Sequence, residues 1–348
     1  MRAGRRVTER RSFAEARAWI DGWPAVGGVE TVARGDAYGR VLAAAVFAPH
    51  DFPPCDRALF AGYAVRAADT VGAGAYTPLL QPGAVAVGEG GALPAGADAV
   101  LPWDLAGLDA AGRVEALSAV AEGGGVERRG QGLRAGAPVL QADCALGSAA
   151  LALLAELGLD LLPLRCRPRV LLAVGALAPL LAPLIARDGG VVAGSGFPPD
   201  LILTSDPESA GTLDIHGLAL RPGGGAGFGR RDGVPVVLVP AEPLACLTAY
   251  DLLAGRLLRR LGGRAAALPQ FTRAATLTRK IVSAIGWVDV VRVRLAGDGA
   301  EPLGSAEGGG LVSAGRADGF VIVPAGREGF APGETVTVRS CQARDDDW

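Results

Sequence analysis

The sequence predicts a multi-domain protein of the α/β plus β class, with one small parallel α/β domain and two β domains. Between residues 169 and 261, apolar segments of strand length alternate with segments of helix length, which is typical of a mainly parallel sheet covered by helices. The segments 49–126 and 272–339 differ, because short apolar runs there are separated by glycine- and proline-rich turns. A length of 348 residues suits two or three domains of about 150 residues each.

These patterns divide the chain into four regions. They are a helical and linker scaffold domain at 8–48 and 127–166, an N-terminal β domain at 49–126, a reduced α/β domain at 167–263 and a C-terminal β domain at 264–344. In the scaffold domain we expect helices at 12–20, at 36–46 and at 148–157. The first has a capping box of Ser12 and Glu15, and the last ends at Gly158.

Charge and cysteine content exclude several classes of protein. The 34 basic residues nearly balance the 36 acidic ones, and a net charge of -2 creates no field that would hold DNA or RNA. The five cysteines are odd in number and never form a C-x-x-C motif, which argues against a disulfide framework or a zinc site. No apolar core follows the basic N-terminus as it would in a secretory signal, so we expect a cytoplasmic protein with reduced thiols.

One apolar run, residues 170–186, could be mistaken for a membrane span. It is slightly shorter than the ~18–20 residues that a span needs, and it contains Gly175, Pro179 and Pro183. We therefore predict a buried strand at 169–174, followed by a turn and a helix entered through proline, and no association with a membrane.

Several sequence motifs follow one another in the order of a known family. They are FPPCDRALFAGYAVRAADT at 52–70, GGALPAGADAVLPWD at 90–104, GVERRGQGLRAGAPVL at 125–140 and ALLAELGLDLLPLRCRPRVLLAVG at 152–175. Together they resemble the molybdopterin molybdenumtransferases, the MoeA/gephyrin family of molybdenum-cofactor biosynthesis. The segments at 277–295 and 316–338 resemble that family's C-terminal β domain.

The resemblance implies an architecture, an activity and an assembly. The α/β domain would be a molybdopterin-binding-like domain, and the protein would form an elongated homodimer. In the family, adenylylated molybdopterin and molybdate meet in a cleft between the α/β domain of one subunit and the N-terminal β domain of the other. Molybdate is inserted into the dithiolene, with Mg²⁺ as the cofactor, while the nucleotide is released.

The N-terminal β domain departs from the family at a position that matters for this chemistry. The family's signature is roughly P-P-F-D-N-S-A-M-D-G-Y-A-V, and its carboxylate before Gly-Tyr is Ala61 here, whose methyl group can neither bind Mg²⁺ nor accept a proton. The acidic residue that ends the next motif is kept as Asp104. The third motif loses two acids but keeps Arg128 and Arg129, which either bind a phosphate or molybdate bidentately or face solvent.

The α/β domain departs further from the family. Ala176 replaces the acid of a Thr-Gly-Asp-Glu motif after the first strand, and a strand–helix unit with further acidic residues is missing. The family's phosphate-cradling loop, T-G-G-V-S-x-G-x-x-D, is represented by Thr204, Ser205, Asp206, Glu208, Ser209, Gly211 and Asp214. Asp206 and Glu208 would repel a phosphate where backbone N–H groups should receive it.

Two further motifs lose polar groups. In the family's P-G-K-P, the first two residues are kept as Pro222 and Gly223, but the lysine is Gly224. The motif L-P-G-N-P-V-S keeps its prolines and loses its glycine and amide, and reads Pro240, Ala241, Glu242 and Pro243. A carboxylate at this helix N-terminus would occupy the anion site itself.

These assignments leave no catalytic residue intact. Asp104 and Asp214 are the remaining candidates for catalysis and, by the resemblance, for binding Mg²⁺. The candidate substrate-binding residues are Arg128, Arg129, Thr204, Ser205, Ser209, Gly211, Pro222, Gly223, Pro240 and Pro243. The ligands that the resemblance implies are Mg²⁺, molybdate and molybdopterin, unless the altered site binds none of them.

Three hypotheses remain open. The first is an active enzyme of molybdenum-cofactor assembly that uses Asp104, Asp214 and the Arg128/Arg129 pair in a reduced site. The second is a non-catalytic, MoeA-like scaffold, in other words a pseudoenzyme, that binds a molybdoenzyme or a cofactor-assembly protein. In the third, the altered pocket binds a cationic ligand through Asp206, Glu208, Asp214 and Glu242. Because the losses lie in several independent motifs, we favour reduced or lost catalysis.

Overall fold

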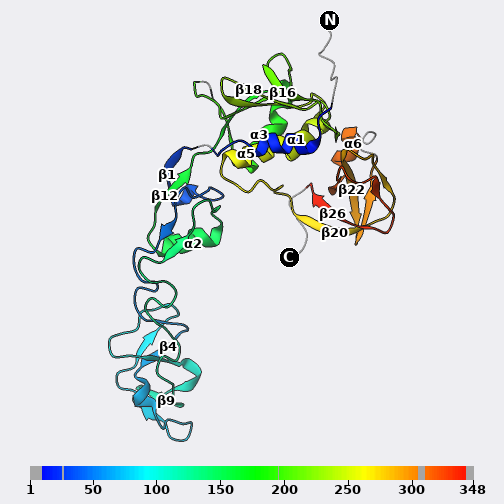
Figure 1. Cartoon of the computed structure of the whole chain (residues 1–348). Coiled ribbons are helices and arrows are strands. Elements are labelled where there is room, and N and C mark those ends of the chain that lie inside the picture. The colour runs from blue at the N-terminus through cyan, green and yellow to red at the C-terminus, as the bar shows by residue number, and fades with distance from the viewer. Residues whose placement is uncertain (1–9, 26, 195, 305–309, 342–348) are drawn as a thin grey trace. The chain divides into compact units, whose positions relative to one another are not determined.

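The chain folds into two compact units, described here one at a time from a computed structural model (Figure 1). The structure describes residues 10–25, 27–194, 196–304 and 310–341. The first unit comprises Met1–Glu30, Gly39–Val41 and Pro163–Trp348, and the second comprises Thr31–Tyr38 and Leu42–Leu162. The ends of the predicted scaffold and C-terminal domains, at 8–9 and 342–344, lie outside the described residues.

The second unit consists mainly of short antiparallel strands. Its two three-stranded sheets have the order β6 (Val85–Val87), β4 (Gly62–Val65), β7 (Ala99–Pro102) and the order β5 (Leu79–Leu80), β9 (Val114–Ala116), β8 (Ala106–Leu108). Two strand pairs are β3 (Arg57–Ala58) with β10 (Val126–Glu127) and β2 (Val46–Phe47) with β11 (Pro138–Leu140). The short 3₁₀ helices are η1 (Arg34–Asp36), η2 (Ala67–Thr70) and η3 (Trp103–Leu105).

Strand β4 separates two small cores because successive side chains of a strand point to opposite faces. Ala64 packs into one cluster with Val100, and Val65 packs into the other with Leu101. All four of these side chains are buried. The two faces of this one sheet therefore each contribute to a separate small core.

Of the predicted scaffold helices, those at 12–20 and 148–157 are confirmed and the one at 36–46 is wrong. α1 (Phe13–Asp21) has the expected capping box, and α2 (Ser148–Glu156) ends before Gly158, whose φ is +70°. Residues 37–45 form no helix. Gly39 has a φ of +68°, and the backbones of Val41 and Leu42 bond instead to Arg165 and Cys144, at 2.8 and 3.0 Å. These long-range bonds override the helical periodicity.

A six-stranded sheet forms the centre of the first unit. Its order is β14 (Val191–Val192), β13 (Arg169–Ala173), β15 (Leu201–Thr204), β19 (Val234–Leu238), β18 (Gly227–Arg231) and β16 (Thr212–His216). The first four strands run parallel, and β18 and β16 are antiparallel to their neighbours. The strand, turn and helix predicted for 169–186 are confirmed as β13, η4 (Gly175–Leu177) and α3 (Ala178–Arg187). Across the described residues, every helix falls short of the length and apolar character needed to cross a membrane.

Helices cover one face of this sheet (Figure 1). They are α1, α3, α4 (Pro243–Ala249) and α5 (Gly255–Leu261), with a π-helical turn at Tyr250–Ala254 between the last two. In β15, Leu201 and Leu203 belong to the large core under the helices, while Ile202 packs on the other face with Ala210 and Val236. Two further strands, β1 (Val29–Ala33) and β12 (Leu161–Arg165), pair with each other.

The C-terminal part of the first unit is a small closed barrel. The strands β22 (Val288–Ala296), β23 (Gly299–Pro302), β20 (Thr272–Leu277), β26 (Thr335–Ser340) and β24 (Gly319–Val323) pair in this order, and β24 pairs back to β22. β21 (Ile281–Val282) pairs with β25 (Gly329–Phe330), and α6 (Gly310–Gly315) precedes β24. A parallel α/β sheet with two regions of small β-sheets confirms the predicted fold class.

The barrel is joined to the α/β sheet through β17 (Leu220–Arg221), which pairs in parallel with β22. Arg221 donates two hydrogen bonds of 2.7 Å to the buried carboxylate of Asp289. Val288, Val290 and Phe320 of the barrel belong to the same apolar core as the helices of the α/β sheet. The α/β sheet and the barrel therefore share one core.

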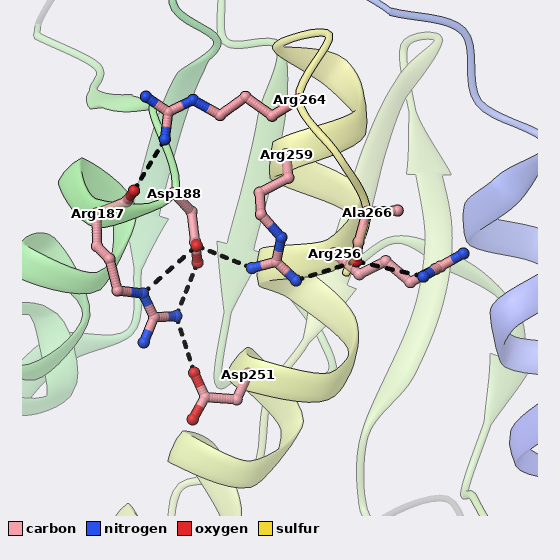
Figure 2. Close-up of polar contacts among 7 residues, drawn as sticks. All are labelled: Arg187, Asp188, Asp251, Arg256, Arg259, Arg264 and Ala266. Atoms are coloured by element: carbon pink, nitrogen blue, oxygen red, sulfur yellow. Dashed lines mark hydrogen bonds and ion pairs between the residues drawn. The ribbon is translucent and has the colours of Figure 1, made fainter. Parts of the chain in front are cut away.

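The buried carboxylate of Asp188 links α3 to α5 (Figure 2). Asp188 accepts hydrogen bonds from Arg187 at 2.9 Å and from Arg259 at 2.8 Å, and its side chain is fully buried. Arg187 also binds Asp251 at 2.9 Å. A Cβ on Gly255 would lie 2.7 Å from the Asp188 carboxylate, so α5 accepts this acid only because glycine stands there.

We predict that Asp188→Asn destabilises the protein by about 3 kcal/mol, because it leaves the buried guanidinium of Arg259 without a compensating charge. The measurement is the free energy of unfolding in urea. The control is Asp298→Asn, which breaks a surface ion pair with Arg273 and should cost less than about 1 kcal/mol. Equal effects of the two substitutions would contradict this role of Asp188.

Candidate functional site

The candidate site lies where the parallel strands of the first unit end. The loops that follow β13, β15 and β19 are adjacent, because the Ser205 N–H donates to the carbonyl of Ala173 at 3.3 Å and the Val239 N–H donates to that of Thr204 at 2.8 Å. In open α/β sheets, ligands bind at this carboxyl edge of the strands. The sequence-predicted residues at 204–211 and 240–243 therefore lie along one edge.

The loop after β15 is filled by its own aspartate. The carboxylate of Asp206 accepts hydrogen bonds from the N–H of Glu208 at 3.0 Å, from the N–H of Ser209 at 3.3 Å and from the Ser209 hydroxyl at 2.5 Å. Thr204, which is buried, bonds through its hydroxyl to the backbone of Asp206. The N–H groups that could cradle an external anion thus already hold an internal one.

These bonds change the acidity of Asp206. The Ser209 hydroxyl, followed by the backbone N–H of Glu208, holds the pKa of the Asp206 carboxyl below its ordinary value of 3.8. The carboxylate therefore remains charged at neutral pH and binds in the loop as an anion.

The N-terminus of α4 is filled in the same way. Glu242 is the N-cap, and its carboxylate accepts hydrogen bonds from the N–H of Leu244 at 3.1 Å and of Ala245 at 2.6 Å. Burial, together with the charge of Glu242, raises the pKa of the Cys246 thiol to about 11. The negative charge predicted for this position is thus bound to the helix itself, while Pro243 begins the helix and Pro240 precedes it.

The turn that holds Pro222 and Gly223 lies against this helix start. Gly223 has a φ of +127°, and a Cβ there would be 3.6 Å from the carbonyl oxygen of Ala245. A Cβ on Gly225 would be 4.0 Å from Pro240. The positive φ of Gly223 favours glycine in this turn, but Gly224, in the position of the family's lysine, supplies no charge.

The remaining positions of this edge carry little chemistry. Ala176 lies in η4 after β13 and is exposed, so the methyl group replaces the expected acid without a substitute. Gly211 has a φ of +72° and closes the loop before β16. Ser205 contributes the backbone bond to Ala173 described above.

Asp214, on β16, is engaged by two other side chains. Its carboxylate accepts a hydrogen bond from the indole N–H of Trp19 at 2.9 Å and pairs with Arg230 at 3.6 Å. With Asp206 and Glu242 bound to backbone N–H groups as well, three of the four acids proposed for a cationic ligand already have partners. This arrangement disfavours the third hypothesis.

The residues of the site do not fit a bound Mg²⁺. Within residues 10–25, 27–194, 196–304 and 310–341, no group of three His, Cys, Asp or Glu side chains could hold a metal ion. Asp104 belongs to the second unit, where it lies exposed in η3. We therefore derive no chemical step through a metal.

In the second unit, Arg128 and Arg129 are held by acids. Arg128 donates to Asp56 at 2.9 Å, and Arg129 donates to Asp51 at 2.9 Å. The backbone N–H of Arg129 and the Arg128 guanidinium lower the pKa of Asp56. The side chains of Arg128 and Arg129 are 44% and 65% exposed, but each has its charge compensated within the unit. Ala61 lies exposed just before β4.

The sequence identified the candidate site residues but not the side chains that bind to them. Asp51 and Asp56 hold the arginine pair, and Trp19 holds Asp214 from a position 195 residues away in the chain. Local sequence contains no signal for such contacts, because each depends on how distant segments meet.

Comparison with protein families gives two matches. A model of the MoeA N-terminal region (domain I and II) matches residues 11–158, and a model of the MoeA C-terminal region (domain IV) matches residues 274–340. The six-stranded α/β sheet lies between these two matches.

Known relatives and structures agree with these matches. The chain is 28% identical to molybdopterin molybdenumtransferase 1 of Mycobacterium tuberculosis over 401 residues, covering 88% of this chain and 93% of that protein. It is 22% identical to a molybdopterin molybdenumtransferase of Staphylococcus aureus over 379 residues, covering 88% and 90%. A molybdopterin biosynthesis MoeA protein from Pyrococcus horikoshii has the same fold, with a TM-score of 0.79, 23% identity and coverage of 95% of this chain and 100% of that one.

We predict that Ser209→Ala raises the pKa of Asp206 toward 3.8, because the hydroxyl is the largest cause of its lowering. Since the pKa is lowered in the folded protein, these bonds stabilise the loop above the ordinary pKa, and this contribution is lost as the pH falls through the lowered pKa. Carboxyl NMR titration measures the shift. Glu208→Ala, which keeps the backbone N–H bond, is the control. An unchanged titration of Asp206 in the Ser209 variant would refute the assignment.

Proposed function

We propose, since the chain belongs to the MoeA family, that it acts in molybdenum-cofactor biosynthesis with weak or lost molybdenumtransferase catalysis. One observation carries the second half of this proposal. At the carboxyl edge of the sheet, the backbone donors of both candidate anion-binding segments are bonded to the protein's own carboxylates, Asp206 and Glu242.

The two carboxylates oppose an anionic ligand in two ways. They use the N–H groups of Glu208, Ser209, Leu244 and Ala245, so these donors are not free for a phosphate or molybdate oxygen. They also place negative charge at the positions where an anion would bind. A phosphate-bearing pterin would have to displace both carboxylates from bonds that they already make well.

The proposed reduction in catalysis also rests on groups that are missing. Ala61 and Ala176 contribute methyl groups where the family resemblance places acids, and Gly224 contributes no charge where it places a lysine. Asp214, which would have to serve as acid or base, bonds to Trp19 and Arg230. We infer that the candidate substrate-binding residues of this edge maintain the loop structure and do not bind substrate. They are Thr204, Ser205, Ser209, Pro222, Gly223, Pro240 and Pro243.

A second candidate function is that of a non-catalytic scaffold that binds a molybdoenzyme or a cofactor-assembly protein. It is favoured by apolar side chains in the second unit, where Leu59, Phe60 and Trp103 are 53%, 37% and 47% exposed. Leu59 and Phe60 directly precede Ala61, the position of the lost acid. Exposed apolar side chains of this size are more common at protein interfaces than on other surfaces.

We further propose a homodimer in the cytoplasm. The five cysteines are unpaired, which suits a reducing compartment. Sedimentation velocity tests the dimer, because a chain of 35.2 kDa should sediment as a species of twice that mass. A monomer at micromolar concentration would contradict this part of the proposal.

We predict that Asp206→Gly combined with Glu242→Gly strengthens the binding of adenylylated molybdopterin by at least about tenfold, because glycine has no side-chain acceptor, so the double substitution removes two charges and frees N–H donors. Isothermal titration calorimetry on the purified protein measures the affinity.

The matched control is Glu208→Gln, which removes one charge from the same loop but frees no donor, and it should have a much smaller effect. Tight binding by the unmodified protein would refute the proposal of a self-filled site. Equal gains in the control and in the double variant would show that general charge, not the occupied donors, opposes the ligand.

A further inference from the structure

A pocket that the family comparison does not explain opens in the first unit between the helices of the α/β sheet and the barrel. Its volume is about 470 Å³, a size that suits a small organic molecule. It is lined by α1, by the π-helical turn and α5, by the segment 266–268 and by parts of the barrel around β22, β24 and β26. None of the loops of the candidate site contributes to it.

The inner surface of this pocket is mainly apolar. The larger apolar side chains that line it are Phe13, Leu252, Leu268, Val288 and Ile322. Leu252 and Val288 are buried, and Phe13, Leu268 and Ile322 are partly buried against the same core. The backing core keeps this surface in place, so an apolar body could bind to it without a rearrangement of the fold.

Four arginines line the same pocket, which otherwise contains one charged residue, Asp251. Asp251 is already paired with Arg187 at 2.9 Å. Two of the arginines, Arg256 and Arg259, are also paired with acids, which leaves a positive charge from Arg17 and Arg339 beside a largely apolar surface.

Two of these arginines are fixed by the protein (Figure 2). Arg259 donates to Asp188 at 2.8 Å, and Arg256 donates to Asp21 at 2.9 Å; both also donate to the carbonyl oxygen of Ala266 at 3.3 Å. The side chain of Arg259 is only 4% exposed, yet its buried Nε has no hydrogen-bond partner among the described residues. The bonds to Asp188 and Ala266 hold this arginine in place in the pocket wall.

The other two arginines have their charges available. Arg17, on α1, is exposed, and Arg339, on β26, is half-buried. Neither side chain makes a hydrogen bond or an ion pair within the described part of the chain, although the charge of Arg17 helps to lower the pKa of Asp21. Guanidinium groups bind carboxylates and phosphates through two parallel hydrogen bonds, so these two side chains can hold one such group.

We propose that this pocket binds a small organic anion, whose apolar body contacts the inner surface and whose phosphate or carboxylate group is held by Arg17 and Arg339. The site is separate from the carboxyl edge of the sheet, so it does not depend on the proposed function. It gives the protein a ligand of its own even if the molybdopterin site is lost.

Three probes separate the two parts of the site. Phenyl phosphate carries both an apolar ring and an anion, whereas phenol lacks the anion and inorganic phosphate lacks the ring. We expect calorimetry on the full chain to detect binding of phenyl phosphate at least about tenfold tighter than that of either partial probe. Raising the salt concentration should weaken phenyl phosphate binding and leave phenol binding unchanged.

Substitutions locate the binding in the pocket. Arg17→Gln and Arg339→Gln should each weaken phenyl phosphate binding by about tenfold, because each removes a charge-assisted contact. Ala267→Trp, at an exposed lining position, should fill the pocket and abolish binding while the thermal unfolding temperature is kept. The matched control is Arg294→Gln, an exposed arginine of β22 outside the lining, which should change nothing.

Each alternative result overturns the proposal. No binding of phenyl phosphate at millimolar concentration would mean that the pocket is not an anion site. Equal affinity for phenol would exclude a role for the arginines, and equal affinity for inorganic phosphate would exclude a role for the apolar surface. Equal loss in the Arg294 control would show that binding occurs on the general positive surface.

Discussion

The buried carboxylate of Asp188 is the interaction on which the first unit depends most. It neutralises Arg259 inside the core and holds Arg187, whose carbonyl oxygen in turn accepts a hydrogen bond from Arg264 at 3.0 Å (Figure 2). Arg264 also donates to the carbonyl of Gly39, so Asp188 links α3 to α5 and Arg264 links the end of α3 to the segment 39–41. Arg259 is also one of the residues that line the pocket beside the barrel. Burial of this charge is tolerated only because its partners surround it.

At the carboxyl edge of the sheet the fold is kept, but backbone N–H groups donate to the protein's own carboxylates. The edge of a parallel sheet normally offers free N–H donors to a ligand. In this chain, Asp206 and Glu242 accept those bonds, so each segment is stable without a ligand. Asp206 and Glu242 therefore oppose the binding of an anionic ligand and at the same time complete the hydrogen bonding of their own segments. This gives a physical reason why the scaffold can persist after its catalytic groups are lost.

Local patterns in the sequence predicted the elements that local interactions form. The capping box at Ser12, the end of α2 before Gly158 and the strand, turn and helix at 169–187 are examples. The expected helix at 36–46 failed because Val41 and Leu42 bond to distant backbone groups. Positions of lost acids, such as Ala61, could be read from motifs. The partners of Asp214 and Arg129 could not, because they come from distant segments, and the four-domain division remains a prediction.

The most direct test of the self-filled site is release of the nucleotide from adenylylated molybdopterin in the presence of molybdate and Mg²⁺. The assay compares the unmodified protein with an intact molybdopterin molybdenumtransferase under the same conditions. Because Asp206 and Glu242 occupy the backbone N–H donors, we predict little or no nucleotide release and no formation of active cofactor. Release at a rate comparable to that of the intact enzyme would contradict the account, and would mean that the ligand displaces both carboxylates.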